Sequence, residues 1–318
     1  MSKDTTSQGK LAEKVRTEKK TLVTQNFLEA AISLFLFGCV PVTIKYISAN
    51  AFTIGVFRLG TASLCLLIFL RMRGEIFRIR LRDLLVLAAL GSLFGAHWMA
   101  HFLSIKISSA SIASIGLSTY GVHLIMLGWF FRKNKVHFTD LIAVLLAAVG
   151  SILIIPAFSL SNDTSLGAGL GILSGLFYAT LPVIHQKYAG ITHSMRAFGQ
   201  FFFGFLFFLL FFPMTEWSLP PQDWLWLLFL GLVCTFIAHT LWVRVTTVLS
   251  TITTSVIFYL FVPIAMILSY LIVHEPMSLG KIMGATLVIA GNIVGLYKQW
   301  KREALIAAVE SRKPMESS

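Results

Sequence analysis

Charged residues are scarce in this chain of 318 residues: they make up 13%, whereas soluble domains carry about 25%. Hydrophobic residues make up 56%, and the mean hydropathy is +0.80. This composition excludes a large soluble enzyme. If each membrane span takes about 20 residues, ten spans leave only short connections and two tails, so we expect no folded domain outside the membrane.

Acidic residues are the scarcer charge, with 14 Asp and Glu against 26 Lys and Arg, and each acid lies at or beyond the end of an apolar run. Ion-coupled carriers often hold Na⁺ or H⁺ with a carboxylate deep in the membrane. The lack of a deep carboxylate argues against Na⁺ coupling. Histidine, or the substrate itself, would have to carry any coupled proton.

Cysteine is equally sparse, because Cys39, Cys65 and Cys234 are scattered through apolar stretches and offer neither a disulfide framework nor metal-ligand spacing. We therefore expect no metal, no cofactor and no catalytic residues. A net charge of +12 would suggest nucleic acid in a soluble protein. Here the basic residues flank apolar runs and act as topology signals, so we expect no nucleic-acid partner.

Ten apolar windows of helical length run through the chain, bounded by charges, proline or glycine. Their all-round hydrophobicity favours helices over the alternating pattern of a membrane barrel. The predicted fold is an all-α integral membrane protein with ten transmembrane helices. The expected spans are Phe27–Ile47, Ala51–Leu70, Leu84–Ile105, Ala110–Phe131, Phe138–Pro156, Gly167–Gln186, Met195–Phe212, Trp224–Val243, Thr251–Val273 and Leu279–Tyr297.

The basic residues predict the orientation of the spans. With the N-terminal tail placed inside, 22 of the 26 Lys and Arg flank inner span ends, and Lys45, Lys106 and Lys281 flank outer ends. The positive-inside rule then places both tails, residues 1–26 and 298–318, in the cytoplasm. We expect a multi-pass protein of the cell inner membrane without a cleaved signal peptide, since no small-residue cleavage site follows the basic N-terminus.

The two halves of the membrane region, residues 27–156 and 167–297, resemble each other at an offset of about 140 residues. Cys39–Tyr46 matches Thr180–Tyr188, so each half carries a proline late in its first helix. A unit of five spans has an odd number of crossings, so its copy must enter the membrane from the opposite side. Two inverted five-helix repeats around a midplane site are a recurring transporter plan. The two prolines are candidate hinges for alternating access: Pro41 and Pro182.

The stretch Ser250–Tyr297 reads as small polar residues, a helix with Pro263, a loop with Glu275, and a last helix with spaced glycines. It resembles the closing pair of helices in the EamA-type family of the drug/metabolite transporter superfamily. Phe57–Ala62 resembles the second helix of that family, and the resemblance covers nearly all of Phe27–Tyr297. It implies a secondary transporter for small metabolites, often an exporter of amino acids or related compounds, and it names no substrate.

Polar and aromatic side chains within the spans are the candidates for substrate binding. Arg58 lies about 11 Å into its span at a rise of 1.5 Å per residue, and a charge at that depth is costly. It could bind a substrate carboxylate, hold backbone carbonyls of a broken helix, or snorkel to the membrane surface. His97 and His101 share a helix face that would suit a metal, but no further histidine cluster supports one. Rings with a polar edge can stack and also donate a hydrogen bond, although each could equally face lipid or lie in an interfacial aromatic belt. The candidate substrate-binding residues are Arg58, His97, Trp98, His101, Tyr120, His123, Tyr178, His239, Trp242 and Tyr259.

Three further expectations concern packing. Spaced glycines in the sixth and last helices should allow close helix contact. Glu275 should have a structural role at the positive end of a last helix opened by Pro276. The almost purely apolar stretch Phe201–Phe212 should face lipid.

The sequence therefore predicts a carrier that moves a small polar metabolite, such as an amino acid or related compound, across the inner membrane as an exporter by alternating access. Its partners would be the substrate and the lipid bilayer. The sequence leaves open whether the protein forms a homodimer. Uptake of a nucleotide-like metabolite such as S-adenosylmethionine is the alternative within transport. A histidine-dependent membrane enzyme or a membrane sensor are the alternatives of another class.

Overall fold

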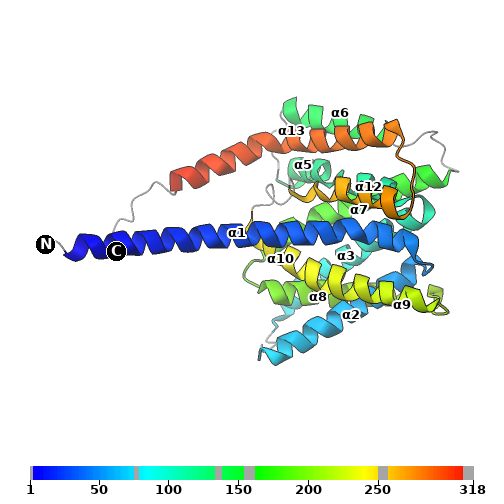
Figure 1. The fold of residues 1–318 in the computed structure, drawn as a ribbon, viewed down its shortest axis with the longest axis horizontal. Coiled ribbons are helices and arrows are strands. Elements are labelled where there is room, and N and C mark those ends of the chain that lie inside the picture. Colours follow the sequence, from blue (N-terminus) through cyan, green and yellow to red (C-terminus); the bar gives the residue numbers. More distant parts are fainter. Residues whose placement is uncertain (1–2, 75–78, 133–137, 154–161, 250–256, 311–318) are drawn as a thin grey trace.

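The computed structural model describes residues 3–74, 79–132, 138–153, 162–249 and 257–310, and the regular structure within these ranges is helical (Figure 1). The prediction of an all-α membrane fold is confirmed. Within the described part of the chain, six helical stretches are long and apolar enough to cross a membrane: Gln25–Tyr46, Ala51–Met72, Leu81–Ile107, Ala110–Leu127, Asp163–Lys187 and Pro221–Val248.

The other predicted spans correspond to shorter helices and to the apolar first part of the last helix, and residues 154–156 and 251–256 of these spans lie outside the described ranges. In chain order the elements are α1 (Lys3–Tyr46), α2 (Ala51–Met72), α3 (Leu81–Ile107), α4 (Ala110–Leu117), α5 (Tyr120–Arg132), α6 (Phe138–Leu153), α7 (Asp163–Lys187), α8 (His193–Leu209), the 3₁₀ turn η1 (Phe212–Met214), α9 (Pro221–Leu228), the π-helical η2 (Phe229–Ile237), α10 (Ala238–Val248), α12 (Phe261–Ile272) and α13 (Leu279–Glu310).

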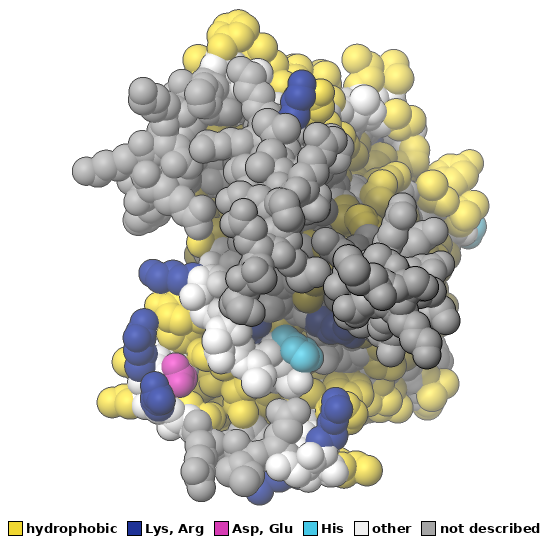
Figure 2. Space-filling view, turned by 90° about the vertical axis from the view of Figure 1, so that its left-hand side faces the viewer, with side chains coloured by type: hydrophobic (Ala, Val, Ile, Leu, Met, Phe, Trp, Pro, Cys, Tyr) yellow, Lys and Arg dark blue, Asp and Glu magenta, His cyan; other side chains and the backbone are white. Residues whose placement is uncertain are grey.

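Helices α1 and α13 both extend beyond the bundle on the same side (Figure 1). The N-terminal tail is therefore not separate from the first span, because α1 runs through both without a break. Lys and Arg side chains are spread over the face of the molecule on this side (Figure 2). Exposed basic residues occupy the helix ends of α2, α3 and α7 that lie there: Arg71, Arg73, Arg80, Arg82 and Lys187.

Glycines bring the helices into backbone contact, as the spacing predicted. A Cβ added at Gly291 of α13 would lie 2.8 Å from the carbonyl oxygen of Ala143 in α6. A Cβ at Gly116 of α4 would lie 2.9 Å from the backbone of Gly171 in α7. At these distances a side chain on either glycine would force the helices apart, so these contacts hold the bundle together.

The fourth predicted span is two helices rather than one. A turn at Ser118 and Thr119 separates α4 from α5, and the two hydroxyls donate to carbonyls three residues earlier at 2.7 and 2.8 Å. Tyr259 and Leu260 form the corresponding turn 141 residues later, before α12. The side-chain amide of Asn292 in α13 donates to the carbonyl of Ser118 at 3.0 Å. Ser118, Thr119 and Tyr259 are buried, whereas Leu260 is exposed. Protein thus surrounds the first turn on all sides, which is the condition for irregular backbone inside a membrane.

The prediction that Phe201–Phe212 faces lipid is wrong for one side of α8. Phe201 and Phe208 are fully buried, and a Cβ at Gly55 of α2 would overlap the ring of Phe208. Uniform hydrophobicity concealed this face, because an apolar helix surface serves a protein neighbour and a lipid equally well. The exposed side of α8 carries Phe202 and Leu206, and the exposed Leu210 directly follows the helix.

Glu275 stabilises the N-terminal end of a helix, as predicted, but that helix is α4 and not the last helix. Helix α13 begins only at Leu279, three residues beyond Pro276. The carboxylate of Glu275 accepts from the backbone N–H of Ser111, in the first turn of α4, at 3.2 Å. It also accepts from the hydroxyls of Ser111 and Ser269 and from the ammonium group of Lys281, the last at 2.7 Å. A negative charge at the start of α4 complements the helix dipole, and it ties the second half of the chain to the first.

Replacing Gly116 with Ala is expected to lower the free energy of unfolding by about 1–3 kcal/mol, because the new methyl group would meet backbone atoms of Gly171. Gly169→Ala is the matched control, since a Cβ there has nothing within 4 Å. Thermal unfolding of the detergent-purified variants measures both effects. A Gly116→Ala variant as stable as the wild type would contradict this account of the helix contact.

The pKa of Glu275 predicts how stability depends on pH. Burial would raise this pKa, but hydrogen bonds from Lys281, Ser109, Ser111 and Ser269 outweigh burial and hold it at about 2. Because the folded-state pKa is depressed, the stabilisation is complete above the ordinary carboxyl pKa of about 4.3 and is lost as the pH falls toward 2.

Glu275→Gln is therefore expected to unfold more easily at pH 7, by about 1.5–3 kcal/mol for the lost charged hydrogen bonds. The difference from the wild type should shrink as the pH falls to 3. Unfolding curves at pH 7, 5, 4 and 3 test this, with the exposed Glu216→Gln as control. A difference that stays constant down to pH 3 would assign the effect to side-chain shape instead of charge.

Candidate functional site

Nine of the ten predicted binding residues lie together where the two halves of the chain meet, in what we call the central cluster. Its side chains are joined by ring contacts or, for Arg58, by stacking on Trp98, and each is at most 7% exposed. The first half contributes Phe37, Arg58, Phe94, His97, Trp98, His101 and Tyr120, and the second half contributes Tyr178, His239, Trp242, Phe258 and Tyr259.

The central cluster follows the internal repeat. At an offset of 141 residues, Trp98 corresponds to His239, and these two rings meet with centroids 5.3 Å apart. At the same offset Phe37 corresponds to Tyr178, and both lie in the cluster. Equivalent positions of the two halves thus place rings in the same cluster, and the cluster is built from both halves.

Hydrogen bonds set the orientation of several rings in the cluster. The indole N–H of Trp242 donates to the hydroxyl of Tyr178 at 2.7 Å. A ring nitrogen of His97 forms a hydrogen bond with the hydroxyl of Ser174 at 2.7 Å, and its ring lies 5.0 Å from that of Tyr178. Residues of α3, α7 and α10 are therefore coupled, and the polar edges of these rings have defined positions.

The rings of Tyr178 and Phe258 stack with centroids 4.7 Å apart, and Tyr120 meets both of them edge-on. Tyr259, at the helix break before α12, lies 5.3 Å from Tyr120. The two helix breaks thus each adjoin a tyrosine of the cluster. Movement at either break would change the arrangement of these rings.

Arg58 is the one cation within the central cluster. Its Nε–H donates to the hydroxyl of Thr235 at 3.0 Å, and its guanidinium lies 4.1 Å from the ring centroid of Trp98 and 5.2 Å from that of Phe102. Thr235 belongs to the π-helical turn η2, and its hydroxyl donates to the carbonyl of Leu230 at 2.6 Å. π-Helical backbone such as that of η2 is rare within α-helices and is often found at functional sites.

Other predicted residues lie at the border of the cluster or outside it. His123 is half-buried on α5, and its ring contacts the backbone of Gly175 in α7, apart from the other candidates. Pro41 and Pro182 are buried within α1 and α7. Each proline removes the N–H that would bond to the carbonyl four residues earlier. Those two carbonyls belong to cluster members, Phe37 and Tyr178.

Sequence reasoning missed several members of the site. Phe94 precedes Trp98 by one helical turn, so helix spacing could have identified it. Phe37 could have been found as the repeat partner of Tyr178. Ser174 and Thr235 could not be identified from the sequence, because each belongs to the site only through a hydrogen bond to another helix, with His97 and Arg58 respectively.

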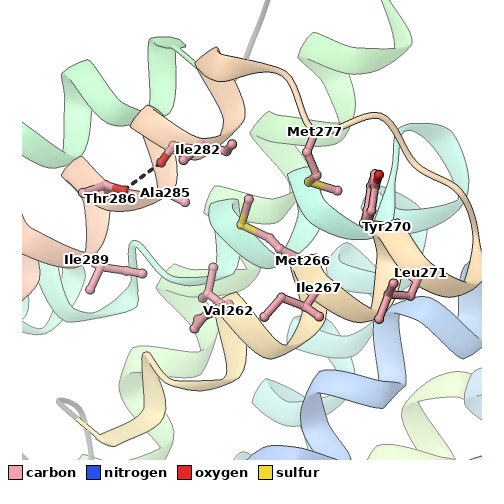
Figure 3. A pocket seen from close by; sticks show the side chains of 11 residues that line it. Val262, Met266, Ile267, Tyr270, Leu271, Met277, Ile282, Ala285, Thr286 and Ile289 are labelled. Atoms are coloured by element: carbon pink, nitrogen blue, oxygen red, sulfur yellow. Dashed lines mark hydrogen bonds between the residues drawn. The ribbon is translucent and has the colours of Figure 1, made fainter.

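A groove of about 370 Å³ lies between α12 and α13 (Figure 3). Val262, Met266 and Ile267 line it from α12, and Ile282 and Ile289 line it from α13. The hydroxyl of Thr286 in its wall donates to the carbonyl of Ile282 in the same helix at 2.8 Å. The groove suits an apolar occupant, whereas the central cluster offers polar edges.

Comparisons with known proteins agree with the helical fold and its two halves. The model of the EamA-like transporter family matches residues 27–155 and 165–296. An uncharacterized transporter of Archaeoglobus fulgidus is 26% identical over 206 residues, which cover 62% of this chain and 71% of that protein. The uncharacterized transporter YetK of Bacillus subtilis is 30% identical over 221 residues, which cover 65% of this chain and 66% of that protein.

A solved crystal structure has a TM-score of 0.63 to this chain at 14% identity, covering 86% of this chain and 97% of its own. At that identity the likeness supports the fold alone. The family model, in contrast, matches both halves of the membrane region separately. The chain is a multi-pass membrane transporter that belongs to the EamA-like transporter family.

Proposed function

We propose that this protein moves a small polar metabolite across the cell inner membrane by alternating access, as an exporter, with the central cluster as its binding site. The observation that carries the proposal is a buried set of rings with polar edges, contributed by both repeats. A site shared between two rocking halves can open to either side in turn. Ring faces would hold the apolar part of the substrate, and ring edges would bind its polar groups.

The proposed binding residues are the nine predicted members of the central cluster, and His123 is a further candidate at its border. Within the described residues, hydrogen bonds join the helices beyond the cluster at both ends. On one side, Lys106 donates to the carbonyl of Ile47 at 2.5 Å, and the backbone N–H of Ser48 donates to Asp223 at 2.8 Å. On the other side, Arg244 pairs with Glu29 at 2.6 Å. Opening toward either side would break the contacts at that end while the other set holds.

The basic face at the ends of α2, α3 and α7 supports the proposed orientation. In inner-membrane proteins, excess Lys and Arg remain on the cytoplasmic side. Since α1 and α13 extend from this same face, both chain ends would lie in the cytoplasm (Figure 1). An exporter would then bind its substrate from the side that carries the basic residues.

Counterflow in liposomes tests the proposed transport. Purified protein is reconstituted, and exchange of labelled amino acids and nucleotide-like metabolites is measured at pH 6 and pH 8. We expect saturable exchange of one compound class, lost in a Trp98→Ala/Trp242→Ala variant that still folds. Exchange of the nucleotide-like class alone would favour the alternative substrate. No exchange from folded protein across the whole panel would contradict transport of a small polar metabolite of these classes.

The prolines provide a test of alternating access. Replacing Pro41 or Pro182 with Ala restores a helical hydrogen bond beside the cluster, and we expect the exchange rate to fall several-fold while the substrate affinity changes little. Pro221→Ala is the control, because Pro221 is the first residue of α9 and its missing N–H has no partner within the helix. Unchanged rates in both hinge variants would refute their role as hinges.

A further inference from the structure

Among the described residues, two arginines are completely buried, Arg58 and Arg196, and their surroundings differ. Arg196 is satisfied by its own bundle: Nε donates to the carbonyl of Ile191 at 2.9 Å, Nη1 to the carbonyl of His185, and Nη2 to the hydroxyl of Thr247 at 2.9 Å. Such an arginine fastens helices together, since every nitrogen of the guanidinium has an oxygen partner.

The guanidinium of Arg58 does not have a hydrogen-bond partner for every nitrogen. Only its Nε has a partner, the hydroxyl of Thr235, and both Nη atoms are buried without a hydrogen-bond partner among the described residues. The buried carboxylates of the described residues have other partners. Glu29 pairs with Arg244, and Glu275 pairs with Lys281. Asp223 accepts from Ser48 at the end of α1.

An unpaired guanidinium in a buried site is costly, because a charge removed from water needs an opposite charge or several hydrogen bonds in return. The ring of Trp98 covers one face of the guanidinium and compensates only in part. If this side chain served only to fill space, an apolar side chain of similar volume would do so without the free-energy cost of burying a charge. The unpaired Nη atoms therefore point to a partner that arrives from outside the protein.

We propose that Arg58 binds a carboxylate group of the transported compound, so that the substrate class is a small monocarboxylate with an apolar body. This inference rests on the proposed transport function and names the group that the site recognises. The two Nη atoms form a planar fork that matches a carboxylate through two parallel hydrogen bonds. The neighbouring rings of Phe94, Trp98 and His239 would contact the apolar body.

The charge of the cluster favours one carboxylate over a phosphate monoester. Arg58 is the only Lys or Arg among the members of the central cluster, and a single cation neutralises one negative charge. A phosphate monoester carries close to two charges at pH 7 and would leave one buried without a partner. Phenyl phosphate is therefore expected to bind more weakly than phenylacetate.

The first test needs no ligand and compares Arg58→Gln with Arg196→Gln in thermal unfolding. A binding role predicts that Arg58→Gln is as stable as the wild type or more so, because it removes an uncompensated buried charge, whereas Arg196→Gln is less stable. Equal losses of stability in the two variants would place Arg58 among the structural residues and overturn the proposal.

The second test measures binding to wild-type protein and to the Arg58→Gln and Arg58→Lys variants. The probes are acid and amide pairs: L-alanine with L-alaninamide, L-leucine with L-leucinamide, L-phenylalanine with L-phenylalaninamide, and phenylacetate with phenylacetamide. We expect at least one acid to bind, its amide to bind about 10-fold or more weakly, Arg58→Gln to lose that preference, and Arg58→Lys to keep part of it.

Amides that bind as well as their acids, an acid preference that survives in Arg58→Gln, or no binding by any acid would each overturn the proposal. The outcome for transport is separate. Exchange of a neutral compound that is intact in Arg58→Gln would preserve the transport function and discard the carboxylate. Arg58-dependent binding of an acid without any exchange would preserve the carboxylate site and discard transport.

Discussion

Inside a membrane, no bulk water is available to satisfy a polar group, so every buried donor, acceptor or charge needs a partner within the protein or in a ligand. This constraint organises the structure. The backbone satisfies itself in helices, and where a helix is interrupted, side chains complete the hydrogen bonds. Ser118 and Thr119 bond within their own turn, and Asn292 reaches the same turn from α13.

The same constraint explains how the halves are held together. Glu275 lies on the second half of the chain but serves the N-terminal end of α4 in the first. Lys281 neutralises the charge of its carboxylate. The carboxylate oxygens also accept from the hydroxyl of Ser111 in the first half and from that of Ser269 in the second. Glycines complete the arrangement by bringing α4 onto α7 and α6 onto α13 at backbone distance. Polar contacts at the ends of the helices and glycine contacts along their length thus replace the hydrophobic effect that would hold a soluble core together.

Against this background the central cluster stands out. Some of its rings are joined by hydrogen bonds, as Trp242 and Tyr178 are. The fully buried Arg58, in contrast, has two nitrogens without a hydrogen-bond partner among the described residues. Other buried polar atoms also lack a partner, among them one oxygen of Glu29, but among the described residues only Arg58 leaves two atoms of one charged group unpaired. It does so beside the ring of Trp98, which in turn contacts His239 of the second repeat. That juxtaposition suits the proposed binding site: a buried cation, ring edges held in defined positions, and helix breaks next to two of the rings, Tyr120 and Tyr259.

The sequence by itself determined the helical membrane fold, the repeat and the residue types of the central cluster, because hydrophobicity and helical spacing are local properties of the chain. It identified Arg58, Trp98 and Tyr178 for the same reason: polar or ring-bearing side chains are conspicuous within apolar runs. Only the tertiary structure decided that α4 and α5 are separate helices, that one side of α8 is buried, and that Glu275 caps a helix of the other half. These outcomes depend on partners far apart in the sequence, as does the difference between a satisfied Arg196 and an unsatisfied Arg58.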